Sequence, residues 1–345
     1  MRAFLYEQYG GPEVLFVRER PVPEPKPAQV RVRVHAASIN AADYRMMRAD
    51  PFLVRLANGL FRPKKYPVLG IDLAGVVEAV GAGVTQWKVG DAVFGECVED
   101  GMGSFAESVC VRADRIAALP DGTSFAEAAA IPLAGITALQ GVRDLGEVGT
   151  GAKVLVQGAG GGVGHFAVQI AKACGAHVVA VCGAGSADLA RACGADEVLD
   201  YRTTDFAARD ERYDVIFGIN GHRSVGTYHR CLAPGGRYVM IGGSNGQIFA
   251  AMLWAPLRFR FSDKTCRILH IDGAKRGEDL QQLRRMWIEG TLRPSIDRTY
   301  EFNELRDAMR YVEQGHVRGK VVLRYPRARS SPSSTSSSPN ANSSA

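Results

Sequence analysis

Residues Val154–Gly164, with the sequence VLVQGAGGGVG, place a short apolar run directly before a glycine-rich turn. The run Val154 to Gln157 predicts a buried strand, and the following HFAVQIAKACGA has the apolar spacing of a helix packed on a sheet. In a strand, glycine turn and helix unit, the glycines let the backbone approach a pyrophosphate. The free N–H groups and the dipole of the helix N-terminus attract that anion. We therefore predict a dinucleotide site, and its contacts in this turn are Gly158, Gly160, Gly161, Gly162, Val163 and Gly164.

The end of the next predicted strand, HVVAVCG at 177–183, indicates which dinucleotide binds. An NAD site usually has Asp or Glu here to bond the ribose hydroxyls, but this chain continues with Ala184, Gly185 and Ser186. Without a carboxylate, a 2′-phosphate meets no like-charge repulsion, so NADPH is favoured. Ser186, Arg191 and Tyr201 are the nearby groups that can bind the phosphate, although Arg191 is equally compatible with a solvated helix face.

Composition and charge are those of a two-domain globular enzyme. The chain has 345 residues, of which 46% are apolar, and a net charge of +6, which suits an anionic cofactor. No stripe of Lys and Arg alternates with aromatic residues, so no nucleic-acid partner is predicted. The seven cysteines form no CxxC pair, which argues against a disulfide framework and favours a reducing compartment.

No targeting or membrane-spanning segment is apparent. The start, MRAFLYEQYG, lacks the pattern of a signal peptide, and the apolar stretch Ile248–Leu257 is too short to cross a bilayer. We therefore expect a cytoplasmic protein without a membrane span. The Ser- and Pro-rich end, residues 327–345, has too few apolar residues to fold and is predicted to be a disordered tail.

The order of patterns along the chain predicts an α/β protein with two domains. Strand-like runs broken by Gly and Pro fill residues 1–123, and a helical stretch begins at Ser124 with Glu127 completing a capping box. From Lys153 to Gly243 strands and helices alternate, as in a doubly wound parallel sheet. We assign 1–123 and 265–326 to a mostly β catalytic domain and 124–264 to a Rossmann dinucleotide-binding domain. The substrate is expected in the cleft between them.

Eight short motifs in this order resemble those of one enzyme superfamily. They are GGPEVL at 10–15, ASIN at 37–40 followed by Asp43 and Tyr44, GIDLAGVV at 70–77, VGDAV at 89–93, GSFAE at 103–107, LAGITA at 133–138, LAPGG at 232–236 and GHVRGKVVL at 315–323. Over residues 1–325 the chain resembles the medium-chain dehydrogenase/reductase superfamily, and specifically its zinc-free quinone oxidoreductase-like branch. The resemblance implies that the mostly β domain is GroES-like and that the protein forms a homodimer.

The resemblance also implies that no metal is bound. Zinc relatives carry a ligand Cys where this chain has Asn40 to Asp43, and a His-Glu pair where it has Ile71-Asp72. A zinc site needs three suitable protein ligands and an open position, which Asn40 and Asp72 do not supply. Relatives with a structural zinc have four cysteines between about residues 90 and 110, where this chain has only Cys97 and Cys110.

The chemistry open to a zinc-free relative is hydride transfer from NADPH to a quinone or an activated C=C bond. The electron-poor acceptor stabilises negative charge itself, so the protein needs to orient it and to donate a hydrogen bond to its oxygen. Tyr44 is the first candidate donor, with packing under the cleft as the alternative. Asn40 is expected to hold the nicotinamide amide or the substrate oxygen, although an ordinary turn residue would look the same.

The remaining expected roles follow from position. Asp43 is expected to anchor its loop, and Asp72, within an apolar run, to make a structural hydrogen bond. Thr137 resembles the family residue that meets the cofactor, and Gly242 is a further predicted cofactor contact. The leading function is an NADPH-dependent reductase of quinones or α,β-unsaturated carbonyls. A 2-enoyl-thioester reductase and a non-catalytic NADPH-binding protein stay open, although the intact glycine turn favours catalysis.

Overall fold

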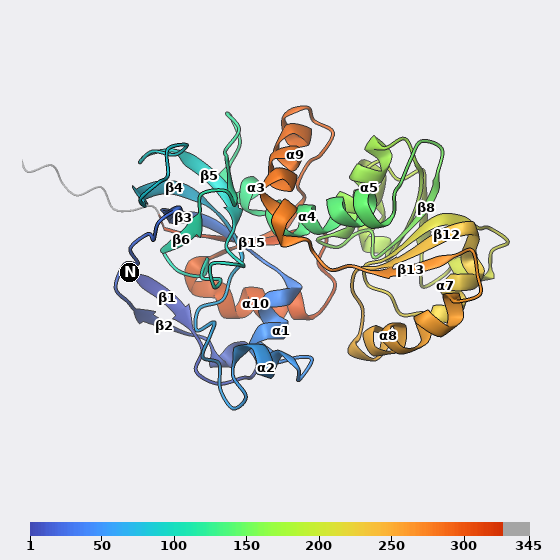
Figure 1. The fold of residues 1–345 in the computed structure, drawn as a ribbon, viewed down its shortest axis with the longest axis horizontal. Helices are drawn as coiled ribbons and strands as arrows, with labels where there is room; N and C mark the ends of the chain where they lie inside the picture. Colours follow the sequence, from blue (N-terminus) through green and yellow to red (C-terminus); the bar gives the residue numbers. More distant parts are fainter. Residues whose placement is uncertain (327–345) are drawn as a thin grey trace, which may run out of the picture.

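The computed structural model describes residues 1–326, so the predicted tail at 327–345 lies outside the described residues. Figure 1 shows two bodies, each built on its own sheet. The chain starts in the first body, crosses to the second and returns to the first before its end. This course agrees with the prediction of a mostly β domain interrupted by a Rossmann domain.

The first body contains a seven-stranded sheet in the order β14-β15-β3-β4-β5-β7, with β6 also paired to β3. In β3 the alternation of Val with Arg buries Val30, Val32 and Val34 on one face, as expected for a half-buried strand. A pair of short strands, β1 (Arg2–Leu5) and β2 (Phe16–Glu19), lies beside this sheet. The sheet strands are β3 (Gln29–Ile39), β4 (Asp72–Val80), β5 (Ala92–Glu96), β6 (Ser108–Arg112), β7 (Ile116–Ala118), β14 (Ile296–Glu301) and β15 (Lys320–Arg324).

Helices cover this body at one end. They are α1 (Ala41–Arg48), α2 (Val54–Asn58) and α10 (Leu305–Glu313), with short 3-10 turns at Pro12–Val14 and Phe302–Glu304. Leu305, Ala308 and Met309 of α10 are fully buried in the apolar core of this body. Their spacing of three and four residues is that of one helix face.

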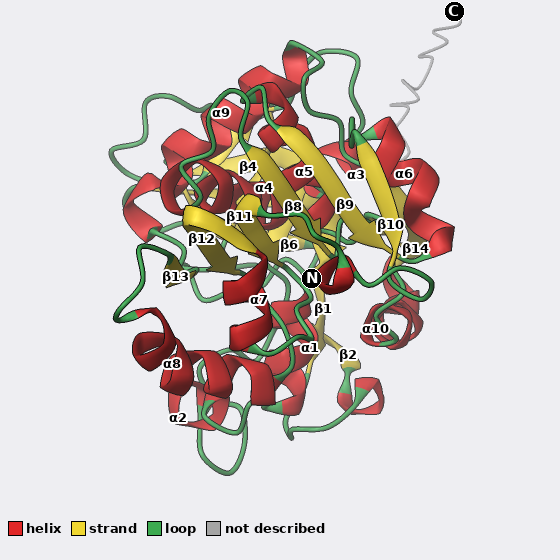
Figure 2. Cartoon of the chain, turned by 90° about the vertical axis from the view of Figure 1, so that its right-hand side faces the viewer, coloured by secondary structure: helices red, strands yellow, loops and turns green. Residues whose placement is uncertain are grey.

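The second body is a six-stranded parallel sheet in the order β10-β9-β8-β11-β12-β13, seen in Figure 2 with helices around it. The strand order reverses between β8 and β11, which is where doubly wound sheets bind nucleotides. The strands are β8 (Lys153–Gln157), β9 (His177–Cys182), β10 (Glu197–Asp200), β11 (Tyr213–Gly218), β12 (Leu232–Met240) and β13 (Thr265–Ile268), and the helices are α5 (Gly164–Ala173), α6 (Ala187–Ala192), α7 (Val225–Cys231) and α8 (Asn245–Phe259). The predicted strands and their parallel arrangement are confirmed.

The strand that starts at Thr265 does not belong to the first domain, as we had assigned it. It pairs in parallel with β12, with Cys266 opposite Tyr238, and so forms the edge of the second sheet. The first sheet resumes only at β14, after α9 (Arg276–Ile288), whose Leu280 and Leu283 pack in an apolar cluster shared by the two bodies. A four-residue apolar strand looks the same in either sheet, so the sequence pattern alone could not distinguish them.

The helical segment between the bodies is divided by a proline. Ser124 caps α3 (Phe125–Ala129) as predicted, because its Oγ accepts a bond from the Glu127 backbone N–H at 3.2 Å. Pro132 has no N–H to donate, and a second helix, α4 (Pro132–Gln140), begins there and runs into a π-helical turn at Gly141–Leu145.

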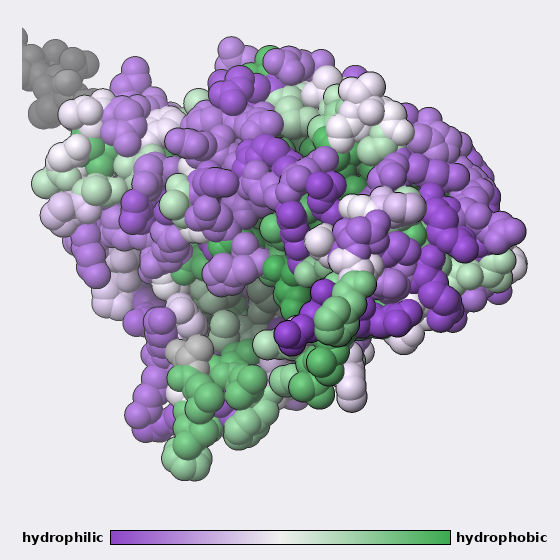
Figure 3. All heavy atoms as spheres, turned by 45° about the vertical axis from the view of Figure 1, so that its right-hand side comes forward, coloured by the Kyte–Doolittle hydropathy of each residue, from purple (hydrophilic) through white to green (hydrophobic). Residues whose placement is uncertain are grey.

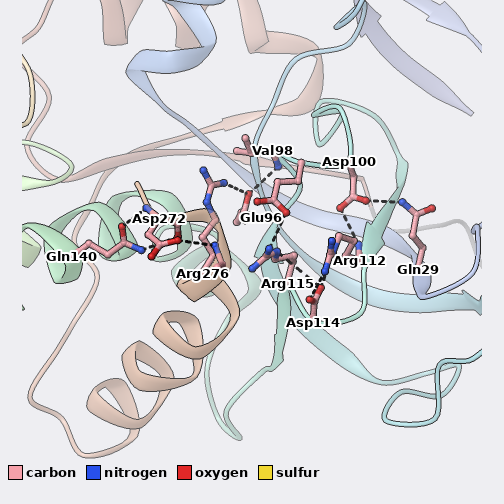
Figure 4. A network of polar contacts seen from close by, with 12 residues as sticks. Gln29, Glu96, Val98, Asp100, Arg112, Asp114, Arg115, Gln140, Asp272 and Arg276 are labelled. Atoms are coloured by element: carbon pink, nitrogen blue, oxygen red, sulfur yellow. Dashed lines mark hydrogen bonds and ion pairs between the residues drawn. The ribbon is translucent and has the colours of Figure 1, made fainter. Parts of the chain in front are cut away.

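Polar contacts away from the glycine turn also join the two bodies, as Figure 4 shows. Arg276 at the start of α9 donates to the buried Glu96 carboxylate of β5 at 3.2 Å, and burial raises the pKa of Glu96. Nearby, the Gln140 side chain bonds the backbone of Asp272 in both directions, at 2.8 and 3.1 Å. The first contact holds α9 against the first sheet, and the second holds α4 against the segment that precedes α9.

Among the described residues, no helix is both long and apolar enough to cross a membrane.

Candidate functional site

The predicted cofactor residues follow the carboxyl ends of neighbouring parallel strands. Gln157 of β8 lies opposite Val181 of β9 and Gly218 of β11, and Gly218 lies opposite Met240 of β12. The glycine turn, the Gly183–Ser186 loop and Gly242 therefore meet at one edge of the sheet. This is the edge at which open α/β sheets bind their ligands.

Three glycines of the turn are required by the backbone itself. Gly158 has φ +87°, and its N–H donates to Val181 O at 2.9 Å. A Cβ on Gly164 would lie 2.0 Å from Gly158 O, and one on Gly160 would lie 2.3 Å from the Ser186 Cβ. These positions let the turn close tightly and let α5 begin against β8.

The other two glycines, Gly161 and Gly162, leave room above the turn. A Cβ on Gly161 would meet only Gly158 O at 3.5 Å, and one on Gly162 would touch the Lys320 side chain at 3.2 Å. The chain itself thus has little need of glycine at 161. A close backbone approach to a pyrophosphate at the α5 N-terminus would explain it, and the residues fit a dinucleotide.

His165, the second residue of α5, is fully buried beneath this turn. Its Nδ1 lies 3.0 Å from the Gly161 carbonyl, which can only accept, and its Nε2 lies 3.3 Å from the Ser295 N–H, which can only donate. Both contacts require the neutral ring protonated at Nδ1. Burial lowers the pKa of His165 to about 4.

We predict that this histidine makes stability depend on pH. Between pH 6.5 and about 4 the unfolded chain binds a proton at this position that the folded chain does not, so stability falls as the pH is lowered through that window. Above pH 6.5, the lowered pKa of His165 contributes roughly 3 kcal/mol to the free energy of unfolding. Urea unfolding at both ends of this pH window measures the contribution. The wild type is compared with His165→Gln, because glutamine does not titrate.

The matched control is the exposed His177, for which His177→Gln should retain the wild-type pH dependence. The buried Asp43 acts in the opposite sense, because burial raises its pKa to about 7. The contribution of His165 is therefore the difference between the wild type and His165→Gln in the pH dependence of the free energy of unfolding. If His165→Gln kept the wild-type pH dependence of stability, the assignment of a neutral His165 ring would be wrong.

The three candidates for the 2′-phosphate lie at different distances from the turn. Ser186 sits against Gly160, and Tyr201, partly exposed, lies beside Gly183, whose built Cβ would be 3.3 Å from the Tyr201 ring. Arg191, on α6, is exposed and pairs with the exposed Asp188 at 2.9 Å. The geometry groups Ser186 and Tyr201 with the turn, while Arg191 is occupied on the surface.

Arg318 is a cation in this region to which the sequence analysis gave no role. It lies just before β15, in the other body. Its Nη1 donates to Gly185 O at 3.3 Å, and its Nε lies 3.6 Å from the Asp297 carboxylate. It thereby reaches the loop that follows β9, where the 2′ position of the ribose is expected. Its only sequence signal was its place in the motif at 315–323.

Asn40 lies in a buried polar cluster at one edge of the first sheet. Its Nδ2 donates to Asp72 Oδ2 at 2.9 Å, and its Oδ1 accepts from Lys320 Nζ at 2.6 Å. Asp72 also accepts from Ser38 Oγ at 2.7 Å, from the Leu133 N–H at 2.8 Å and from Lys320 Nζ at 3.3 Å. The sheet register explains the cluster, because the end of β3 lies between the starts of β4 and β15.

Lys320 connects this cluster to the glycine turn, and the sequence analysis gave it no role. It is 3% exposed, its aliphatic chain would touch a Cβ at Gly162, and the preceding Gly319 N–H donates to Gly160 O at 2.9 Å. A buried ammonium therefore stands between the cofactor turn and Asn40. Residues 40 and 320 are 280 positions apart in the chain, so no local pattern could reveal the pair.

The other expected residues surround this cluster. Asp43 anchors its loop as expected, since it accepts from the backbone N–H groups of Asn40 at 2.8 Å and Gly70 at 3.0 Å. Tyr44, one helical turn after Asn40, is half-buried against the core, and among the described residues its hydroxyl makes no hydrogen bond. Thr137 Oγ1 donates to Leu133 O at 2.6 Å, within the helix that also bonds Asp72.

Gly242 lies just past β12, where the two bodies touch. Its N–H donates to Gly218 O at 3.1 Å, and Arg45 of α1 donates to the carbonyl of the next residue, Gly243, at 2.7 Å. A groove of about 570 Å³ between α7 and α8 lies elsewhere, lined by residues such as His229 and Trp254. It contains neither the glycine turn nor Asn40, so it is a different site.

Comparison with known proteins agrees with this geometry. Residues 26–121 match the alcohol dehydrogenase GroES-like domain and residues 193–323 match the zinc-binding dehydrogenase family. A chloroplast envelope quinone oxidoreductase homolog of Arabidopsis thaliana is 32% identical, over 94% of this chain and 98% of the relative. The chain belongs to the medium-chain dehydrogenase/reductase superfamily, in its quinone oxidoreductase-like branch.

Two further members of the superfamily bear on the chemistry. A 2-methylene-furan-3-one reductase of Solanum lycopersicum is 33% identical, over 94% of this chain and 79% of the relative. The Escherichia coli quinone oxidoreductase solved with NADPH superposes with a TM-score of 0.79 at 25% identity, over 94% of this chain and all of that chain. The protein is an oxidoreductase of the quinone and enone reductase type with a nicotinamide cofactor.

The zinc in the name of the matched family does not fit the residues present. Asn40 and Asp72, at the positions of zinc ligands in relatives, are occupied by each other and by the Lys320 ammonium. Within residues 1–326, no three His, Cys, Asp or Glu side chains are grouped so that they could hold a metal ion. A cation bound beside a buried ammonium would also meet like-charge repulsion.

Proposed function

We propose that the protein is a zinc-independent, NADPH-dependent reductase that transfers a hydride to quinones or α,β-unsaturated carbonyls. The observation that carries this proposal is the buried Lys320, which supplies a fixed positive charge between the glycine turn and Asn40. The names of the relatives, which include quinone oxidoreductases and a 2-methylene-furan-3-one reductase, support the same acceptor class. The homodimer and the cytoplasmic location stay predictions from the sequence.

Residues of this chain would position the reactants rather than react themselves. NADPH supplies the hydride when it is bound. The turn at 158–164 would bind the pyrophosphate, and Lys320 holds the Asn40 amide with its oxygen inward, so its second Nδ2–H is the group left to meet a nicotinamide or substrate oxygen. Tyr44 would donate a hydrogen bond to the oxygen on which charge develops.

The preference for NADPH rests on charge near the ribose. No acidic residue occurs at 183–187, directly after β9, and Arg318 reaches the Gly185 carbonyl from the other body. A guanidinium at this place favours a phosphate over a hydroxyl, since charge-assisted hydrogen bonds are about twice as strong as neutral ones.

We predict that Arg318→Gln lowers the affinity for NADPH about tenfold and leaves the affinity for NADH unchanged. Fluorescence titration of the two cofactors measures both constants. The matched control is Arg191→Gln, which removes an exposed cation already paired with Asp188. If the control loses NADPH affinity and Arg318→Gln does not, the phosphate is bound at α6 instead.

We predict that Tyr44→Phe lowers turnover with enones by up to about a hundredfold, because one hydrogen-bond donor to the developing oxyanion is lost. A quinone accepts a hydride with less assistance, so the loss with quinones should be smaller. The affinity for NADPH should not change. Steady-state kinetics with both acceptor classes checks this. If the turnover of Tyr44→Phe equals that of the wild type with both classes, Tyr44 is a packing residue.

The function itself is tested with a panel of quinones, enones and 2-enoyl-thioesters, assayed by the loss of NADPH absorbance. We expect turnover with quinones or enones, and a metal chelator should leave the rates unchanged. Preferred turnover of enoyl-thioesters would establish the alternative acceptor. Binding of NADPH without turnover of any class would indicate a non-catalytic protein.

A further inference from the structure

One end of the molecule carries two exposed apolar segments, residues 52–61 around α2 and residues 249–261 on and after α8. Figures 1 and 2 place α2 and α8 at the same end, and Figure 3 shows their hydrophobic side chains gathered there. Two hydrogen bonds join the starts of the segments, from Asn245 to Asp50 and from Arg45 to Gly243. We call the exposed apolar side chains of both segments the apolar end.

Helix α8 is apolar on both faces. Ala251, Ala255 and Phe259 are buried against the second sheet, whereas the side chains on the outward face, from Phe249 to Leu257, include five that are 50–65% exposed. A surface helix normally presents polar residues outward, and a helix that is apolar all round is normally covered. Around α2, Phe61 is 86% exposed as well. Exposed apolar side chains gathered in this number mark an interaction site.

The charges around the apolar end are mainly positive, and two exposed carboxylates, Asp50 and Asp263, lie directly beside it. Residues 51–66 contain four cations and no Asp or Glu, and residues 245–262 contain two cations and no Asp or Glu. Among the described residues, none of the six forms an ion pair with a carboxylate; they are Arg55, Arg62, Lys64, Lys65, Arg258 and Arg260. A second copy of the chain, docked by twofold symmetry, would set these cations against each other.

We propose that the apolar end attaches the protein peripherally to a bilayer that contains anionic lipids. Aromatic and leucine side chains would enter the boundary between headgroups and acyl chains, while the unpaired Arg and Lys would meet lipid phosphates. Each of these two contributions is weak alone, and together they give stable attachment. The proposal goes beyond the reductase activity and does not rest on it.

The test is co-sedimentation of the full chain, without cofactor or substrate, with vesicles of phosphatidylcholine alone and of phosphatidylcholine mixed with phosphatidylglycerol. We expect binding to the anionic vesicles, and weaker binding at high salt. The double variants Phe61→Ser/Arg62→Gln and Arg260→Gln/Phe261→Ser should each lower the partition coefficient at least about tenfold, from lost apolar burial and lost charge. All four side chains are exposed, so the fold should survive.

The matched control is Lys88→Gln/Val89→Ser, which removes an exposed cation and an exposed apolar side chain from the loop between β4 and β5, at the opposite end of the molecule. It should bind vesicles like the wild type. Absence of wild-type binding, or equal loss in the control, would overturn the proposal. A dimer in solution that Arg260→Gln/Phe261→Ser dissociates, without vesicle binding, would show that a second copy covers the apolar end.

Discussion

Gly161→Val is expected to weaken NADPH binding about a hundredfold or more while the protein stays folded. A Cβ at this position meets only one protein atom, Gly158 O, at van der Waals distance, so we expect the turn to accept a side chain here in the absence of cofactor. The space that it fills is where the pyrophosphate must approach the backbone. Cofactor titration by fluorescence gives the affinity, and circular dichroism with thermal unfolding shows whether the fold is kept.

The matched control is Gly149→Val, on a loop where an added Cβ has no neighbour within 4 Å. It introduces the same side chain and should leave both affinity and stability near wild type. A folded Gly161→Val protein that binds NADPH at wild-type strength would place the pyrophosphate elsewhere and remove the basis of the proposed function.

Lys320→Met is expected to lower the free energy of unfolding by about 3–5 kcal/mol, because it leaves the buried Asp72 carboxylate without its cation. The variant also removes the hydrogen bond to the Asn40 amide oxygen, so turnover should fall more than cofactor affinity does. Urea unfolding measures the first effect and steady-state kinetics the second. The control is Lys172→Met, which breaks the partly exposed Lys172–Asp196 pair and should cost no more than about 1 kcal/mol.

A double-mutant cycle separates the ion pair from general packing. If Lys320 stabilises the fold through Asp72, Asp72→Asn should recover a large part of the stability lost in Lys320→Met, because the uncompensated charge is gone. It should not recover turnover, since the hydrogen bond from Lys320 to the Asn40 oxygen is still missing. Strict additivity of the two losses would show that the lysine acts through its aliphatic chain alone.

Local features were predictable because the residues that cause them are neighbours in the chain. Strand β8, the glycine turn and α5 occupy one continuous stretch, and the Ser124 cap and Glu127 are three residues apart. The parallel sheet followed from the alternation of strand and helix patterns, whose period depends only on the backbone. The sequence also showed that residues 40 and 72 are Asn and Asp, which do not form the ligand set of a zinc site.

By itself, the sequence determined the α/β class, the glycine turn and the absence of an acidic residue at 183–187, since each is encoded by adjacent residues. Only the tertiary structure decided that β13 belongs to the second sheet, that Arg318 reaches Gly185 and that Lys320 bonds both Asn40 and Asp72. These arrangements depend on strand register and on the packing of two bodies whose residues are far apart in the chain. The exposed face of α8 could not be predicted for the same reason. An apolar run predicts burial, and only the packing of the fold shows which of its side chains stay exposed.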